Sequence, residues 1–534
     1  MISKIKENKN IIILIFIIIV GSLWLIKDGI IVSDDATFHV GRVQGLANSI
    51  KTGDFLAYIH NTYYGYASGL FYSNFFIYLP AILNVTGLDN ISSLKVLYFL
   101  INIFTTLTIF FSLKSITYNN KTAIFGTILY MFTNYRIVDI FLRAALGEML
   151  AFMVIPIVIL GLYEIIYRDY KKWYIFSIGF VLLLLSHLIS TILLAFFILI
   201  IILINIKKLI NEKQRIKYLL ISGAVGLLLG GFFFFPIIEQ KFFGNIEIFI
   251  NKSYYLPQDN SFSFKELFIE KNNVVLGLSL LFLFPLRFFI KETDNKELLK
   301  FADCLFVLAL IAWFSITDIF PWKLLGNTLH FIQFPWRLLI ISTTFLAIAF
   351  SIYFLLINNN KMKYLIFFTT CVLSFGNIIR YYSYVANNHE VHYSLNPNSL
   401  EYKEYLPANT DPIKLEEMNH YMVFNKDELL ITNYKKIGNI ISFEYMNNNN
   451  LDTYVEVPLF NYLGYYSDDA EISTGNNNVI RLHLTKKSGK VEVYYSGTLI
   501  QKISLFVSII TLFAIIFYIL KKSLSKRRKN EIYE

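Results

Sequence analysis

Charged residues are scarce in this chain: they make up 16% of its 534 residues, whereas hydrophobic residues make up 55%. A soluble protein needs more polar side chains to cover its surface, so this composition excludes a soluble globular domain. Cysteine is nearly absent, and its two copies, Cys304 and Cys371, both lie within apolar runs. We therefore expect buried free thiols, with no disulfide and no cysteine-bound metal.

Several short catalytic motifs are also absent. The chain has no Walker A motif, no Gly-x-Gly-x-x-Gly opening a helix, no His-Glu-x-x-His, no paired Cys-x-x-Cys and no Gly-x-Ser-x-Gly. These absences argue against nucleotide hydrolysis, a redox cofactor and a zinc protease.

Long apolar runs recur along most of the chain, and they are long enough to cross a hydrocarbon core of roughly 30 Å. The first run follows a lysine-bearing head and lacks a cleavage site, so it is predicted to be an uncleaved anchor. Together the runs predict a polytopic α-helical membrane protein with about twelve transmembrane helices. The candidate spans are Ile11–Ile26, Leu94–Leu113, Ala123–Ile140, Met149–Ile166, two short ones within Trp173–Ile206, Tyr218–Phe235, Val274–Phe289, Phe301–Ile319, Leu338–Ile357, Tyr364–Ile379 and Ile503–Leu520.

Basic residues occur in every second loop if the interrupted apolar stretch Leu70–Val85 does not cross. The C-terminal tail, with Lys-Arg-Arg-Lys at Lys526–Lys529, then falls on the same side as these loops. The positive-inside rule places that side, and both termini, in the cytoplasm of a multi-pass protein of the cell membrane. The net charge of +10 is thereby explained by topology, and a nucleic-acid partner is not expected.

Two polar regions then lie outside the cell. Residues 27–93 form an outer loop with an amphipathic helix near Phe38–Ile50 and a membrane-edge helix at Leu70–Val85. Residues 381–498 alternate apolar and polar side chains between Asn and Gly turns, which predicts an antiparallel β-sandwich. The predicted domains are therefore residues 1–380 (transmembrane, including the outer loop), 381–498 (β-rich) and 499–534 (last span and basic tail).

The segment Asp-Asp-Ala-Thr-Phe-His-Val-Gly-Arg, from Asp34 to Arg42, places four ionisable side chains beside the first span. If a helix begins near Ser33, Asp35, His39 and Arg42 share one face of it. A carboxylate beside a basic partner can accept a proton from a hydroxyl, as a general base does. Locally, the segment is also an ordinary helix start, with the acidic residues favoured by the helix dipole.

Further ionisable residues gather at the same predicted face, where unpaired charge is costly. Arg143 and Glu148 could form a plain salt bridge or belong to a site. His187 could cap a turn between two short spans. Arg337, in the segment Phe-Pro-Trp-Arg, could be a cation at the membrane interface or bind a phosphate. Their convergence predicts an outward-facing active or binding site.

The chain resembles the GT-C class of integral-membrane glycosyltransferases, and more narrowly the bacterial YfhO-like (6-pyruvoyl-tetrahydropterin-synthase-related) membrane proteins. The resemblance rests on one span, a long outer loop opening with acidic residues, many further spans and an outer β-domain. It runs through six segments in order: Asp34–Phe55, Gly65–Leu83, Asn134–Ile165, Leu183–Leu188, Ile332–Leu339 and Val457–Ser467.

The resemblance implies transfer of a sugar from a polyprenyl-phosphate donor to a glycan, cell-wall polymer or glycolipid acceptor on the outer face, with inversion. It implies that the acidic pair holds the catalytic base, and Asp35 is preferred to Asp34 because it shares a face with His39 and Arg42. The residue patterns add the predicted substrate-binding residues, which are His39, Arg42, Arg143, Glu148, His187 and Arg337. A divalent cation assists some GT-C enzymes, but no ligand set predicts one here. A polysaccharide or lipid transporter or flippase is the competing hypothesis, although transporters usually carry their charges near the midplane.

Overall fold

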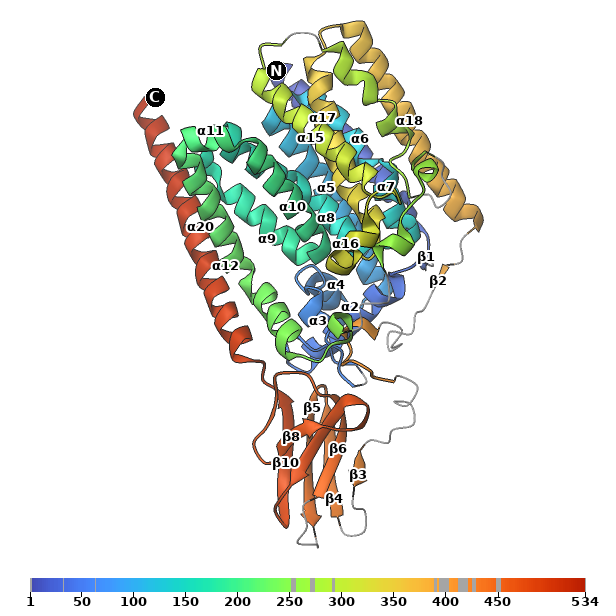
Figure 1. Cartoon of the computed structure of the whole chain (residues 1–534), viewed down its shortest axis with the longest axis vertical. Helices are drawn as coiled ribbons and strands as arrows, with labels where there is room; N and C mark the ends of the chain where they lie inside the picture. The colour runs from blue at the N-terminus through green and yellow to red at the C-terminus, as the bar shows by residue number, and fades with distance from the viewer. Residues whose placement is uncertain are drawn as a thin grey trace. The chain divides into compact units, whose positions relative to one another are not determined.

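The computed structural model describes residues 2–31, 33–62, 64–250, 256–268, 274–290, 293–388, 391–392, 403–411, 421–424, 429–447 and 453–533. Helices dominate the chain up to Asn388, and strands follow towards the C-terminus (Figure 1). The α-helices are α1 (Ile2–Ser22), α2 (Ala36–Lys51), α3 (Ser68–Phe71), α4 (Tyr78–Val85), α5 (Asn90–Thr117), α6 (Asn120–Met131), α7 (Asn134–Val138), α8 (Leu146–Tyr167), α9 (Tyr174–Ser186), α10 (Leu188–Ile204), α11 (Ile206–Asn211), α12 (Lys213–Phe243), α13 (Glu247–Ile250), α14 (Leu278–Leu281), α15 (Lys296–Phe314), α16 (Trp322–Leu329), α17 (Leu339–Leu356), α18 (Asn360–Asn388) and α20 (Leu499–Tyr533).

The strands are β1 (Ile30–Ile31), β2 (Val391–His392), β3 (Met422–Phe424), β4 (Leu429–Ile437), β5 (Ile440–Asn447), β6 (Thr453–Phe460), β7 (Tyr465–Ser467), β8 (Glu471–Thr474), β9 (Val479–Leu484) and β10 (Ser488–Tyr495). The chain divides into two compact units. Unit 1 comprises Met1–Thr37, Leu94–Gly226 and Ser253–Leu395, and unit 2 comprises Phe38–Ser93, Leu227–Lys252 and Asn396–Glu534.

Unit 1 is a helical bundle. Helix α8 packs against α9, and α17 packs against both α15 and α6. Gly161 of α8 allows the first of these contacts, because a Cβ there would lie 2.4 Å from the backbone nitrogen of Phe176. Small residues commonly permit such close approach of helices in membranes.

Seven helices among the described residues are long and apolar enough to cross a membrane, fewer than the twelve predicted. The predicted span Ala123–Ile140 is divided, since α6 ends at Met131 and α7 begins at Asn134. At this break the Asn134 side-chain amide donates a 3.1 Å hydrogen bond to the carbonyl oxygen of Val275. These helices establish a helical, membrane-associated protein. The seven candidate spans are Lys9–Ile26, Asn90–Thr117, Leu146–Tyr167, Lys213–Phe243, Pro335–Leu356, Asn360–Asn387 and Leu499–Lys522.

The two cysteines, Cys304 and Cys371, are free thiols, as expected. Both are partly buried by the rest of the chain, less than the burial expected for them. Their helices, α15 and α18, leave part of their surface uncovered by the rest of the chain.

Unit 2 contains the predicted amphipathic helix, which is α2. The predicted Leu70–Val85 helix, however, is two short helices, α3 and α4, separated at Asn74. The Asn74 side chain accepts a hydrogen bond at Oδ1 from His60 Nε2 and donates another from Nδ2 to the carbonyl oxygen of Ala57. Burial, reinforced by the charge of Arg42, lowers the pKa of His60 to about 3, so this histidine is neutral. These buried polar contacts hold the chain in a turn where the hydropathy pattern predicts a helix.

Two four-stranded antiparallel sheets follow in unit 2, ordered β4-β5-β10-β7 and β3-β6-β9-β8. In the first sheet, Val491 of β10 faces Phe443 of β5, and both side chains are buried. In the second, Val455 of β6 faces Leu482 of β9, again with both buried. Such cross-strand apolar pairs stabilise antiparallel sheets. The predicted antiparallel β-region is therefore confirmed.

Candidate functional site

Five side chains of unit 1 form a buried ionic cluster, which consists of Tyr135, Asp139, Arg143, Glu148 and Arg337. A single turn of π-helix at Asp139–Arg143 places Asp139 and Arg143 four residues apart on one face. Arg143 Nη1 lies 2.6 Å from Asp139 Oδ1 and 3.0 Å from Glu148 Oε1. π-Helical turns are rare and frequently occur at functional sites.

Glu148 is the centre of this ionic cluster. Its Oε1 binds Arg143 Nη1 and also lies 3.7 Å from Arg337 Nε. Its Oε2 accepts a 2.5 Å hydrogen bond from the Tyr135 hydroxyl, which in turn accepts one from Arg143. The salt bridge between Arg143 and Glu148 that the sequence left open is thus present. The negative charge of this one carboxylate offsets the repulsion between the two guanidinium groups.

The backbone is strained at two points beside the ionic cluster. Ala144, directly after Arg143, has a left-handed conformation with φ 49° and ψ 36°. Gln333 has φ 59° and ψ −56°, and its Oε1 accepts a 2.8 Å hydrogen bond from Arg337 Nη1. Non-glycine residues rarely adopt positive φ, and such strain tends to persist at ligand-binding and catalytic sites. Gln333 orients Arg337 through this hydrogen bond, and Ala144 directly follows Arg143 in the chain.

Asp35 adjoins the ionic cluster and immediately precedes α2, which begins at Ala36 and not near Ser33 as predicted. Its backbone N–H donates a 2.9 Å hydrogen bond to the carbonyl oxygen of Arg143. Burial raises the pKa of the Asp35 carboxyl to about 6, against the opposing effects of Arg143 and Arg337. A carboxylate with such a pKa can accept a proton near neutral pH and release it again.

Asp34 differs from its neighbour in exposure, because its side chain lies at the surface of the unit. Partial burial raises its pKa as well, and the charge of Arg143 opposes this shift. Of the two aspartates, Asp35 is the more buried and the more closely influenced by the arginines.

His187 joins α9 to α10 and caps the second helix. Its Nδ1 lies 2.8 Å from the Ser190 hydroxyl and accepts a 3.4 Å hydrogen bond from the Ser190 backbone N–H. The capping role weighed from the sequence is therefore present. His187 also lies close enough to Glu148 and Arg337 to interact with their charges.

The remaining candidate residues, His39 and Arg42, lie on α2 in unit 2. Arg42 Nη2 donates to the carbonyl oxygens of Tyr72 and Ser73 at 2.9 and 2.8 Å, and its guanidinium lies 4.3 Å from the Tyr72 ring. His39 is buried and packs edge-on against the same ring. Burial lowers the pKa of Arg42 to about 10, so it stays charged. No described carboxylate forms an ion pair with Arg42, so its charge is met by the two carbonyl oxygens and the Tyr72 ring.

Among the described residues, no group of three or more His, Cys, Asp and Glu side chains is placed to hold a metal ion.

Tyr135 and Asp139 are members of the ionic cluster that the predicted site residues did not include. Tyr135, Asp139 and Arg143 are spaced by four residues, and this helical spacing is the signal that could have included them.

No described protein family, curated protein or solved structure matches the chain.

Proposed function

We propose that this protein is a GT-C-type glycosyltransferase that moves a sugar from a polyprenyl-phosphate carrier to a glycan or glycolipid acceptor outside the cell. The observation that carries the proposal is Asp35, a partly buried carboxylate with a raised pKa, bonded through its backbone to Arg143 of the ionic cluster. The proposal includes twelve spans, cytoplasmic termini and an outer β-sandwich formed by the two sheets.

In the proposed reaction, an acceptor hydroxyl oxygen attacks the anomeric carbon of the donor sugar. The new carbon–oxygen bond forms as the bond from that carbon to the phosphate oxygen breaks, which inverts the anomeric centre. The hydroxyl proton passes to the Asp35 carboxylate, and the polyprenyl phosphate departs with the bonding electrons. A base with a pKa near 6 is well matched to this proton transfer at neutral pH.

The arginines supply positive charge for the departing phosphate. Glu148 and Asp139 already pair with Arg143, so part of its charge is compensated within the ionic cluster. Arg337, whose Nε lies 3.7 Å from Glu148 Oε1, is the second cation of the ionic cluster. Fixed cations that meet charge developing in the transition state commonly supply much of the catalytic effect.

The direct test is to incubate the purified full-length protein, in lipid nanodiscs, with polyprenyl-phosphate-linked sugars and candidate acceptors. The proposal expects release of polyprenyl phosphate together with a glycosylated product. Movement of intact lipid-linked glycan across proteoliposomes, without cleavage of the sugar–phosphate bond, would instead identify the protein as a transporter or flippase.

A further inference from the structure

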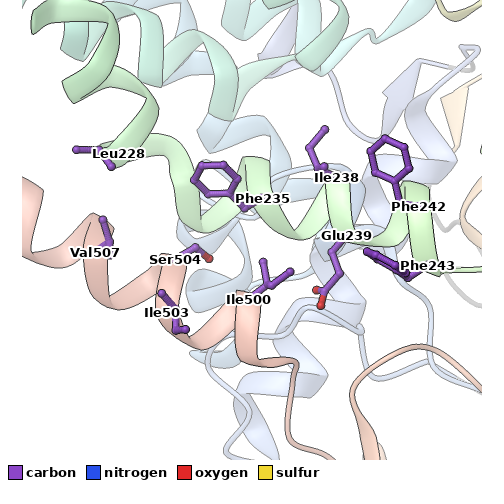
Figure 2. A pocket seen from close by; sticks show the side chains of 10 residues that line it. All are labelled: Leu228, Phe235, Ile238, Glu239, Phe242, Phe243, Ile500, Ile503, Ser504 and Val507. Carbon is purple, nitrogen blue, oxygen red and sulfur yellow. The ribbon is translucent and has the colours of Figure 1, made fainter.

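An apolar groove of about 400 Å³ lies in unit 2 between α12 and α20. Figure 2 shows the side chains that line it from both helices, with Glu239 reaching towards α20 beside Ile500. Glu239 is the one charged residue among them, and Ser504 is the one hydroxyl. The volume lies within the range of roughly 300–1,000 Å³ that is typical of ligand pockets.

Hydrogen bonds link α12 to α20, and to the residue that precedes α20, at two levels along the groove. Towards one end, the Ser508 hydroxyl donates to the carbonyl oxygen of Leu228 at 2.9 Å and accepts from the backbone N–H of Phe232 at 3.1 Å. Towards the other, the Thr498 hydroxyl donates to Glu239 Oε2 at 2.6 Å. The two helices run antiparallel (Figure 1) and are linked at these two levels.

Both helices are candidate spans, and most of their apolar surface is not covered by the chain itself: 39% of the α12 window and 17% of the α20 window are buried. Phe242, Phe243 and Ile503 line the groove and are largely exposed. In a bilayer, the medium in contact with such a groove is hydrocarbon, and filling it with a lipid chain recovers dispersion contacts that an empty space would lose.

Glu239 indicates which type of headgroup the bound lipid has. Its Oε2 already accepts from Thr498, and no described residue donates to its Oε1. A lipid hydroxyl can donate to this remaining oxygen, whereas a lipid phosphate would bring negative charge against a carboxylate. We propose that the groove binds one chain of a diacyl glycolipid, with a hydroxyl of its uncharged headgroup bonded to Glu239.

Photolabelling tests this site in the full-length protein, reconstituted in phosphatidylcholine vesicles. The probes are a monoglycosyl diacylglycerol and a phosphatidylglycerol, each with the same diazirine-bearing acyl chain. We expect the glycolipid to label α12 and α20 at groove residues about tenfold more strongly than the phosphatidylglycerol, as one charge-assisted hydrogen bond would produce. Equal labelling, or stronger labelling by phosphatidylglycerol, would overturn the proposed headgroup.

Three variants sharpen the test. Ser504→Trp fills the groove and should abolish its labelling, whereas Phe506→Trp, at an exposed position of α20 outside the lining, should leave it unchanged. Glu239→Gln keeps the shape of the side chain and should bring the two probes close to parity. If Ser504→Trp fails to fold, the mapped labelling sites and Glu239→Gln still decide the question. Unaltered labelling in Ser504→Trp, or crosslinks to a second copy of the chain, would contradict the proposal.

Discussion

The backbone N–H of Asp35 donates a hydrogen bond of 2.9 Å to the carbonyl oxygen of Arg143, although the two residues are more than a hundred positions apart in the chain. This bond ties the acidic turn before α2 to the π-helical turn that carries Arg143. The Asp35 carboxylate is therefore held by the backbone, and its side-chain oxygens remain available for chemistry.

Replacement of Asp35 by asparagine should lower sugar transfer by about 10²- to 10⁴-fold, the usual contribution of a general base. Asparagine keeps the size and the backbone hydrogen bond but cannot take the proton. The measurement is release of polyprenyl phosphate by the purified variant. Asp34→Asn is the matched control and should retain most of the activity. The reverse ranking of the two variants would assign the base to Asp34.

The activity should also depend on pH through Asp35. Its pKa is raised to about 6, so the carboxylate is protonated and inactive well below that pH. The logarithm of kcat/KM should therefore rise with pH up to about 6 and then level off. A profile measured with a pH-independent acceptor tests this. A plateau that extends down to pH 4.5 or so would argue against Asp35 as the base.

The same raised pKa predicts that Asp35→Asn makes the protein more stable. A carboxyl whose pKa is higher in the folded state favours folding when protonated, and this contribution to the free energy of unfolding is lost as pH rises from about 4 through about 6. At neutral pH the buried charge thus opposes folding, and asparagine removes it. Thermal unfolding should show a higher Tm for the variant at pH 7.5 or so and a smaller difference near pH 4.

Glu148→Gln should destabilise the protein by about 3–5 kcal/mol, because removal of one partner from a buried ion pair leaves uncompensated charge. In this case two guanidinium groups, those of Arg143 and Arg337, lose their shared carboxylate. Thermal unfolding in detergent measures the effect. Glu471→Gln, at a side chain that is 84% exposed, is the control and should change stability little.

His187 offers a way to separate capping from substrate binding. His187→Ala removes the cap of α10 and should cost about 1 kcal/mol, whereas His187→Asn can replace the cap and should fold normally. Stability is followed by thermal unfolding, and function by sugar transfer. If the asparagine variant is as stable and as active as the native protein, the histidine acts only as a cap.

Apolar periodicity and turn residues predicted the elements whose structure is local. Helix α2, the antiparallel strands within residues 381–498, and the helix that carries the last predicted span follow the sequence closely. The prediction of one helix over Leu70–Val85 is wrong, because the helix is interrupted where the Asn74 side chain bonds to two groups distant in sequence, His60 and Ala57. Hydropathy reports apolar content alone, so it does not reveal hydrogen-bond partners that are distant in the sequence.

The candidate site likewise combines features that local sequence predicts with features that depend on residues distant in the chain. Local spacing placed Asp35 on a helical face with His39 and Arg42, but the helix begins one residue after Asp35. The groups that influence Asp35 come from elsewhere in the chain, and they include Arg143 and Arg337. Their convergence depends on a π-helical turn and on a left-handed Ala144. Neither has a signature in a single sequence, because alanine is an ordinary helix residue.

Strand β10 ends at Tyr495 and α20 begins at Leu499, so three residues join a sheet to a candidate membrane span. The Gln501 side chain spans this junction, since it donates to the Tyr495 hydroxyl and accepts from the Thr498 N–H. These two hydrogen bonds restrict the junction between β10 and α20. A displacement of β10 is therefore expected to be transmitted to α20 through this hydrogen-bonded junction.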